Sequence, residues 1–244
     1  MNTLSTSNGD VAIDISELSF SWSERDDPVL GIERLRVQHG EHVFIEGPSG
    51  SGKSTLLSLI AGVVTPQKGS IRVTGKPINE LKGADRDRFR ADHIGFIYQM
   101  FNLIPYLSVV ENVTLPCRFS PRRRSRARDR SSSVETEAMR LLQELGMGDR
   151  AVIRKSAIEL SVGQQQRVAA ARALIGTPEL LIADEPTSSL DAVHREAFIE
   201  LLFKECDQVD NTIVFVSHDT ALAKHFGRTI RLAEVNSPAR GQHS

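Results

Sequence analysis

The segment from His42 to Thr55 constrains the fold more than any other part of the sequence. An apolar stretch, HVFIE, runs into the glycine-rich loop GPSGSGKS, and a helical pattern follows it. The loop fits G-x-x-x-x-G-K-[ST] in the strand–loop–helix setting that this pattern requires, so a chance glycine-rich turn is a poor alternative. Such a loop curls its backbone N–H groups around phosphate oxygens at a helix N-terminus. The phosphate-contacting residues are expected to be Gly47, Pro48, Ser49, Gly50, Ser51, Gly52, Lys53, Ser54 and Thr55.

A second motif, LLIADEP at 180–186, is an apolar strand that ends in two carboxylates. Alone this is a weak signal, because many buried strands end in acidic residues. Beside a phosphate loop, however, Asp184 is expected to hold Mg²⁺ together with the Ser54 hydroxyl, while Lys53 reaches the β- and γ-phosphates. Glu185 lies one residue further along and can polarise an attacking water as a general base. The two motifs together predict nucleotide hydrolysis.

The order of the other patterns predicts an α/β fold. Alternating apolar residues at 11–16 and around Leu35 and Val37 predict half-buried strands, and 70–74 predicts a short antiparallel strand. Further along, strands and helices alternate, which favours a parallel core. The expected core strands are 42–46, 94–98, 180–183 and 212–216, and the expected helices are 54–63, 134–145, 163–175 and 192–206.

Composition narrows the class of protein. Of the 244 residues, 40% are hydrophobic and 25% charged, and the formal net charge of −1 argues against a nucleic-acid coat. No apolar run approaches the roughly 18–20 residues of a spanning helix, and the N-terminus does not resemble a signal peptide. The chain is therefore expected to be soluble and cytoplasmic, without a nucleic-acid partner. Cys117 and Cys206 have no metal-ligand spacing and are expected to be reduced thiols.

The segment PRRRSRARDR at 121–130 is compositionally unusual. A run of charge is most often a solvated loop or helix start on the surface. The alternative is a contact with lipid headgroups or an acidic partner, and the near-neutral charge of the chain does not decide between them. Because the segment lies away from the phosphate-contacting motifs, it is expected to be dispensable for nucleotide hydrolysis.

The sequence LSVGQQQRVAAARAL at 160–174 resembles the signature region of the ATP-binding-cassette (ABC) ATPases, usually written LSGGQ. Ser161 and Gly163 stand at an expected helix start, which is a ready anion site. The resemblance implies that this site, with Gln164, caps the γ-phosphate of an ATP bound by the opposite protomer. Val162 departs from the common pattern, which has glycine there, and this leaves the hydrolysis rate open.

Other elements of that family occur in the expected order. Gln99 matches the Q-loop glutamine, which senses Mg²⁺ and the attacking water, and His218 matches the switch histidine that contacts the γ-phosphate. Asp191 ends SSLD, which matches the D-loop at the dimer interface. Trp22 falls where the family has an aromatic residue that stacks on adenine, with Phe20 as the alternative and a core role open for either.

The resemblance spans roughly residues 11–234 and implies a single ABC domain: an α/β P-loop NTPase cassette with a RecA-like parallel-sheet core. An N-terminal antiparallel β subdomain and an inserted α-helical subdomain at about 100–160 complete it. The segments 1–10 and 235–244 are expected to be flexible tails. The implied cofactors are ATP and Mg²⁺, the implied catalytic residues are Glu185, His218 and Gln99, and the implied metal-contacting residues are Ser54, Gln99 and Asp184.

A narrower resemblance lies in IGFIYQMFNLIPYLSVVENV at 94–113, which is similar to the LolD/MacB branch, including the cell-division ATPase FtsE. There the cassette pairs with a permease, expected here to be a separate transmembrane chain whose coupling helix docks at 99–112. The resemblance implies a homodimer of cassettes, peripheral on the inner face of the membrane, that powers export or extraction of lipoprotein, peptide or drug. An ATP-gated mechanical coupler to an extracytoplasmic partner, without transport, is the alternative.

Overall fold

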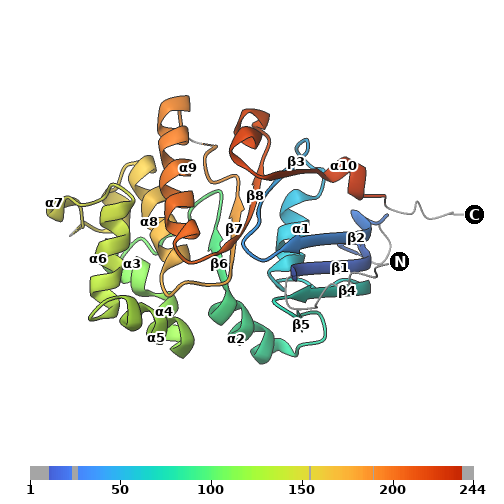
Figure 1. The fold of residues 1–244 in the computed structure, drawn as a ribbon, viewed down its shortest axis with the longest axis horizontal. Coiled ribbons are helices and arrows are strands. Elements are labelled where there is room, and N and C mark those ends of the chain that lie inside the picture. The colour runs from blue at the N-terminus through green and yellow to red at the C-terminus, as the bar shows by residue number, and fades with distance from the viewer. Residues whose placement is uncertain (1–10, 24–26, 154, 189, 238–244) are drawn as a thin grey trace, which may run out of the picture. The chain divides into compact units, whose positions relative to one another are not determined.

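The structure, a computed structural model, describes residues 11–23, 27–153, 155–188 and 190–237 (Figure 1). The expected tail at 1–10 and most of the expected tail at 235–244 lie outside these residues. The chain divides into two compact units. The first combines the residues up to Arg86 with those from Val216 onward, and the second is Asp87–Phe215.

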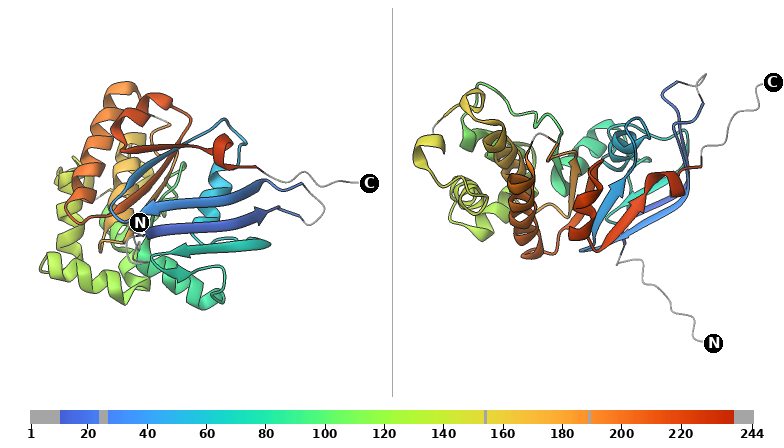
Figure 2. Two further views of the ribbon diagram at one scale, coloured as in Figure 1. Left: turned by 45° about the vertical axis from the view of Figure 1, so that its right-hand side comes forward. Right: turned by 90° about the horizontal axis from the view of Figure 1, so that it is seen from above.

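An antiparallel sheet forms much of the first unit. Its strands are β1 (Val11–Phe20), β2 (Leu30–Gln38), β4 (Lys68–Val73) and the short β5 (Lys76–Pro77), in the order β2-β1-β4-β5. The strands lie side by side in the left view of Figure 2. Ile13 and Ile15 are fully buried while Asp14 between them is half-buried, so the period-two pattern is confirmed as a half-buried strand.

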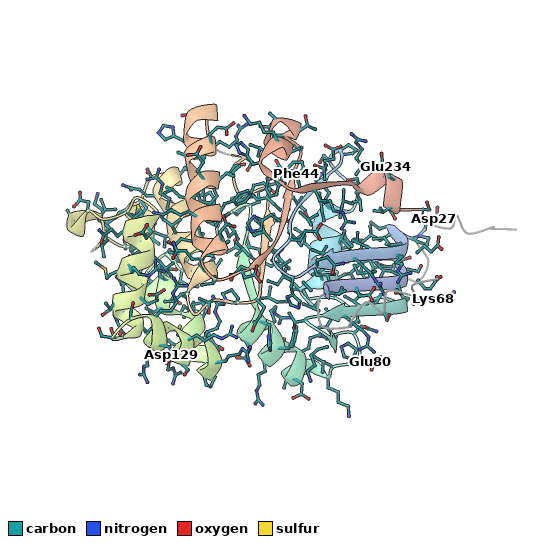
Figure 3. All side chains as sticks on the ribbon, in the orientation of Figure 1. Asp27, Phe44, Lys68, Glu80, Asp129 and Glu234 are labelled. Carbon is teal, nitrogen blue, oxygen red and sulfur yellow. The ribbon has the colours of Figure 1, made fainter. Side chains whose placement is uncertain are left out.

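The first unit also contains a parallel strand pair that supports the phosphate loop. The strand β3 (His42–Glu46) pairs with β9 (Arg228–Arg231), and Phe44 of β3, labelled in Figure 3, is fully buried. The helix α1 (Lys53–Ile60) follows the loop and ends before the expected limit at 63, because Gly62 turns the chain with φ of +66°. The unit also holds η2 (Thr220–His225) and α10 (Leu232–Val235).

The second unit combines a parallel strand pair with helices. The strand β6 (Ile94–Ile97) pairs with β7 (Leu180–Asp184), and β8 (Thr212–Ser217) runs through the division between the two units. Its helices are α3 (Val109–Thr114), α4 (Pro116–Phe119), α5 (Pro121–Arg130), α6 (Val134–Glu144), α7 (Arg150–Ile153), η1 (Ala157–Glu159), α8 (Val162–Leu174) and α9 (Ala192–Asp207). The helix α2 (Gly83–His93) contains the boundary between the two units along the chain. The helices α3, α6 and α8 pack against one another, and α8 also packs against β6 (Figure 1).

The arginine-rich segment is the helix α5, on whose exposed side Asp129 lies (Figure 3). Its solvated interpretation is wrong for Arg123, which is only 2% exposed. Burial lowers the pKa of Arg123 to about 10. Four other arginines of α5 also donate to groups of the protein: Arg122, Arg124, Arg126 and Arg130. Arg126, for example, donates to the Thr177 carbonyl at 2.6 Å and to Glu179 at 2.8 Å. The helix is therefore anchored to the protein rather than presented as a free cationic surface.

Two further sequence expectations concern the thiols and the membrane. Cys117 and Cys206 are both free and buried, and burial raises the pKa of each thiol. Across the part of the chain that the structure describes, no helix has both the length and the apolar character needed to cross a bilayer.

Candidate nucleotide site

The phosphate loop lies between β3 and α1 in the first unit. Gly50 and Gly52 adopt left-handed backbone conformations, with φ of +78° and +98°. A Cβ atom on Gly52 would also lie 2.9 Å from Leu30 Cδ2. Glycine at position 52 is therefore required both by the backbone conformation and by the space available. This turn brings the chain directly into the first residue of α1.

The side chain of Lys53 folds back onto the start of the phosphate loop. Its side chain is buried, and its ammonium donates to the carbonyls of Gly47 at 2.6 Å and Pro48 at 2.9 Å. The next residue, Ser54, is exposed in the first turn of α1, whereas Thr55 is buried. An anion in this loop would meet a positive charge, a free hydroxyl and the N–H groups of a helix N-terminus.

The two aromatic candidates for adenine differ sharply in exposure. Trp22 is 61% exposed just after β1, while Phe20 is 4% exposed within the core. The rings meet edge to face, with centroids 5.1 Å apart at 84°. Phe20 thus packs against Trp22, and Trp22 is the ring that is exposed enough to contact a base.

His218 also belongs to the first unit, in the tight turn between β8 and η2. Its side chain is exposed, while its neighbour Ser217 is buried. The Asp219 N–H donates to Ser217 Oγ at 3.1 Å, and Asp219 in turn caps η2 by accepting from the Ala221 N–H. These short bonds fix the backbone on which the histidine stands.

In the second unit, the two carboxylates lie where β7 ends. Asp184 is the last residue of the strand and is half-buried, and Glu185 is 9% exposed. Glu185 has a φ of +47°, a left-handed conformation that costs a residue with a side chain about 1–2 kcal/mol. Strained backbone of this kind collects at functional sites. Neither the residue type nor its motif predicts this conformation.

The signature residues form a capping box at the start of α8. The Ser161 hydroxyl accepts from the Gln164 N–H at 3.4 Å, and the Gln164 side chain accepts from the Ser161 N–H at 3.0 Å. Val162, the first helical residue, is 48% exposed. A Cβ on Gly163 would touch Leu190 only at an ordinary distance of 3.8 Å, so the described residues leave room for a side chain there.

The segment 188–191 leads into α9. Asp191 is the cap of that helix, since its side chain accepts from the His194 N–H at 3.0 Å and lies 2.7 Å from the His194 ring nitrogen. Ser189 lies outside the described residues. The Ser188 N–H donates to the Glu185 carbonyl, which links this segment to the end of β7.

Gln99 stands exposed in a turn after β6. The turn is closed by a hydrogen bond from the Phe101 N–H to the Tyr98 carbonyl at 2.9 Å. Phe101 and Asn102, the two residues that follow, both have left-handed backbones, with φ of +59° and +49°. The Arg172 side chain of α8 donates to both of their carbonyls, to that of Asn102 at 2.6 Å.

The buried side chain of Asn112, in α3, organises the loop that follows the turn. Its Oδ1 accepts from the Ile104 N–H at 2.7 Å. Its amide donates to the carbonyls of Ile104, Leu107 and Ser108 at 3.0–3.2 Å. One side chain therefore fixes the backbone between Ile104 and Ser108, while Tyr106 at its tip is 82% exposed.

A pocket of about 420 Å³ opens beside this turn, entirely within the second unit. Its wall is largely apolar, with Phe96, Tyr98, Leu115 and Phe119. Phe119 is 69% exposed and borders the pocket. Charged side chains complete the pocket: Asp87, Arg90, Arg123 and Arg172.

The predicted residues fall into two sets, one in each unit. Trp22, the phosphate loop and His218 belong to the first unit. The second unit contains the other set, Gln99, Ser161, Gly163, Gln164, Asp184, Glu185 and Asp191. No group of three or more His, Cys, Asp or Glu side chains within the described residues could hold a metal ion. A metal here would need ligands beyond such side chains.

Comparison with known proteins identifies the family. The ABC transporter family model matches residues 32–188. The chain is 41% identical over 214 residues to the uncharacterized ABC transporter ATP-binding protein YbbA of Escherichia coli K12, covering 88% of this chain and 90% of YbbA. It is 39% identical over 215 residues to the macrolide export ATP-binding/permease protein MacB of Burkholderia thailandensis. This match covers 88% of the chain but only 31% of MacB, so the chain spans about a third of that relative.

Solved cassettes have the same fold. The dimeric structure of a post-hydrolysis state of the ATP-binding cassette MJ0796, bound to ADP and Pi, has a TM-score of 0.75 and 32% identity, covering 94% of this chain and 99% of that one. CbiO1 of Clostridium perfringens has a TM-score of 0.70 and 27% identity, and the match covers 86% of this chain and 79% of CbiO1. The expected fold class, with a parallel-sheet core, an antiparallel sheet and a helical part, is thereby confirmed. The chain belongs to the ABC transporter family and is one of its ATP-binding cassettes.

Proposed function

We propose that this chain binds and hydrolyses ATP as one of two identical cassettes that drive a separate membrane permease of the MacB or LolCDE type. The observation that carries the proposal is the phosphate loop, in which the buried ammonium of Lys53 lies against two loop carbonyls. A buried cation held only by neutral groups favours an anion beside it. The proposed domain is 11–234, with a helical subdomain at about 100–160.

In this proposal the phosphates and Mg²⁺ bind on oxygen-rich groups. Lys53 and the loop N–H groups hold the β- and γ-phosphates. Ser54 supplies a hydroxyl, Asp184 a carboxylate and Gln99 an amide oxygen, and these are the hard oxygen donors that Mg²⁺ prefers. A Mg²⁺ ion held by these residues would take its remaining ligands from phosphates and water. The bound ion would neutralise charge on the phosphates.

Hydrolysis in this proposal needs a base and groups that orient the reacting atoms. Glu185 accepts the proton of the attacking water, and its carboxylate is fixed by the strained backbone directly after β7. Gln99 orients the water, and His218 contacts the γ-phosphate from its capped turn. Each of these side chains stands at the end of a strand or in the turn after it, which gives it a rigid support.

The second copy completes the site. Ser161, Gly163 and Gln164 at the start of its α8 cap the γ-phosphate, and its Asp191 lies at the interface. The open space at Gly163 supports this step, because glycine there is required by nothing within the described residues. A phosphate group from the opposite cassette would need that space. The face of Trp22, exposed in the single chain, would stack on adenine.

The permease would dock at the turn and loop between Gln99 and Asn112 and in the adjoining pocket. Exposed apolar side chains support this assignment: Met100 is 80% exposed, Tyr106 82% and Phe119 69%. A coupling helix with an apolar face would cover them. The cassette would then sit on the inner face of the membrane, held there by its permease, and the chemistry of ATP would be coupled to export or extraction.

The decisive experiment uses Glu185→Gln, which keeps the shape of the side chain but removes the base. ATP should then bind without being consumed, and by linkage it should favour the form that binds it best, the closed dimer. The mass of the variant in solution would be measured with ATP and Mg²⁺, and with ADP. We expect a dimer with ATP only.

The matched control adds Ser161→Arg to Glu185→Gln. The bulky arginine should block the cap on the opposite γ-phosphate and return the protein to a monomer while ATP binding persists. A monomer under every condition would count against a self-sufficient homodimer. Val162 would then be the first position to replace, by glycine, before a different cassette partner is sought.

A further inference from the structure

We propose that Arg172 is a positioning residue for hydrolysis, which clamps the turn that carries Gln99 onto the signature helix α8. This inference rests on the proposed function, because Gln99 acts on ATP there. The structure supplies the contacts: the guanidinium donates to the carbonyls of Phe101 and Asn102 with two of its nitrogens. A planar fork of this kind holds two acceptors in one fixed geometry.

The two carbonyls belong to a backbone that needs support. Phe101 and Asn102 both adopt left-handed conformations. Asparagine tolerates this conformation and phenylalanine rarely adopts it, and two such residues in succession persist only where the surroundings determine them. Phe101 is anchored because its side chain is 6% exposed, but Asn102 is exposed and has no such burial. The guanidinium is the group that holds this end of the turn.

The clamp lies close to Gln99 along the chain. Phe101 donates to the Tyr98 carbonyl, and the Asn102 N–H donates to the Met100 carbonyl at 2.6 Å. Gln99 thus lies inside the turn from Tyr98 to Phe101, and a second, overlapping turn from Met100 to Asn102 follows it directly. The last residue of each turn is one of the two whose carbonyls Arg172 holds. If those residues relax, the Gln99 backbone must turn with them. A small displacement of an orienting group is costly, since about 1 Å can cost 10²-fold in rate.

Arg172 itself has a firm base at the end of α8. The buried guanidinium of Arg123 donates to the carbonyls of Arg172 at 3.3 Å, Ala173 at 2.6 Å and Ile175 at 2.7 Å. It also reaches the Ile94 carbonyl, at the start of β6, at 3.4 Å. The segment from Ile94 to Asn102 is therefore tied to α8 at both ends.

Ser161 caps the start of the same helix, so α8 connects the two groups that must meet an ATP in the proposed mechanism. One is the cap offered to the opposite cassette, and the other is Gln99 of its own cassette. Burial lowers the pKa of Arg172, and the two carbonyls offset the cost of holding its charge there. A charged side chain that is held in a partly desolvated place by two carbonyls suits a residue that positions the turn.

The first test compares Arg172→Gln with a matched control, Arg167→Gln. Arg167 lies on the same helix and is half-buried, as Arg172 is, but it donates to a single backbone carbonyl, that of Gly146 at 3.2 Å, which does not belong to the turn that carries Gln99. We expect Arg172→Gln to lower kcat at least about tenfold while ATP affinity stays within about twofold, since the phosphate loop is intact. The control should hydrolyse ATP at the wild-type rate. An unchanged kcat in folded Arg172→Gln would overturn the proposal.

The second test asks whether Arg172 acts through Gln99. If it does, Arg172→Gln added to Gln99→Ala should lower kcat no further than Gln99→Ala alone. Losses that multiply would show that Arg172 acts elsewhere. Arg172→Lys keeps the charge but loses the fork, and is expected to retain an intermediate kcat. This variant also serves in the same cycle should Arg172→Gln fail to fold.

A third measurement does not depend on ATP hydrolysis. Hydrogen exchange of the amides of Phe101 and Asn102 should speed up at least about tenfold in Arg172→Gln, with the exchange of α6 unchanged. Unchanged exchange at the turn would refute the clamp even in an active enzyme. A wild-type protein that fails to hydrolyse ATP would instead refute the proposed function and leave this exchange result standing.

Discussion

Arg123 of α5 donates from Nη2 to the carbonyl of Ala173 at 2.6 Å, and so caps α8 from a different helix. The last carbonyls of any helix lack partners within the helix, and they carry its partial negative charge. A buried arginine donates hydrogen bonds to these carbonyls and also brings a positive charge to the negative end of the helix. The most arginine-rich stretch of the sequence thus contains one of the chief internal contacts of the second unit.

Replacing Arg123 by methionine should therefore destabilise the protein by about 3–5 kcal/mol. The carbonyls of Ala173 and Ile175 would lose a charged donor in a buried place, where each unsatisfied group costs about 1–3 kcal/mol. Denaturant unfolding measures the change. Arg128→Met, at an exposed position of the same helix, should change stability by less than about 0.5 kcal/mol. Equal effects of the two variants would refute this account of α5.

Replacing Lys53 by alanine should weaken ATP binding by about tenfold to a hundredfold. Hydrogen bonds to charged groups contribute about 1.5–3 kcal/mol, and the ammonium in the loop is the charge nearest to the expected phosphates. Calorimetric titration with ATP and Mg²⁺ gives the affinity. Lys76→Ala, on the exposed strand β5, serves as the control and should bind as the wild type does. An unchanged affinity in Lys53→Ala would remove the phosphate-loop assignment.

Trp22→Ala should raise the ATP dissociation constant about tenfold, because stacking on a base contributes roughly 1–3 kcal/mol. Since Trp22 is the sole tryptophan, ATP should also quench the fluorescence of the wild-type protein. Phe20→Ala should behave differently: it opens a cavity in the core and costs about 3–5 kcal/mol of stability. If Phe20→Ala instead weakens ATP binding and leaves stability unchanged, the assignment of adenine to Trp22 is wrong.

Glu179 should make the protein sensitive to acid. Burial opposes its ionisation, but hydrogen bonds from His93 and Arg122 prevail and lower its pKa to about 2, from an ordinary value of 4.5. Its contribution is therefore fully present above about pH 4.5 and is lost as the pH falls towards 2. The stability gap between the wild type and Glu179→Gln should narrow across that window. A gap that stays constant from pH 5 to 2.5 would contradict this, as measured by unfolding in denaturant at about six pH values.

Much of the fold was predictable because its signals are local. The strand at 42–46 was predicted with its observed limits, since an apolar run ends at a glycine loop. The helix α2 was missed, because GADRDRFRADH buries only Phe89 and shows no apolar stripe. Tertiary packing rather than periodicity holds such a helix in place. Its position could not be obtained from the pattern alone.

The candidate site likewise combines residues that local motifs predict with features that distant contacts determine. Lys53, Asp184 and Glu185 were placed from their motifs, whereas the burial of Arg123 was not foreseen. Its partners lie about 50 residues away along the chain, so no local pattern reports them. Composition describes a segment by its average and cannot single out one buried member. The left-handed turn at Phe101 and Asn102 is likewise held by a distant side chain. Asparagine is common in this conformation, but phenylalanine is not, so the pair of residue types does not predict it.

The four hydrogen bonds of Asn112 have a thermodynamic consequence for any partner of the loop from Ile104 to Ser108. A loop that is ordered only on contact gives up about 1–2 kcal/mol of backbone entropy for each residue it fixes. Here the loop is already ordered in the folded chain, so the exposed ring of Tyr106 is presented to the partner on a rigid base. A partner should therefore bind this loop without a separate ordering step. Asn112→Ala should lower the association rate constant, although the side chains that contact the partner are unchanged.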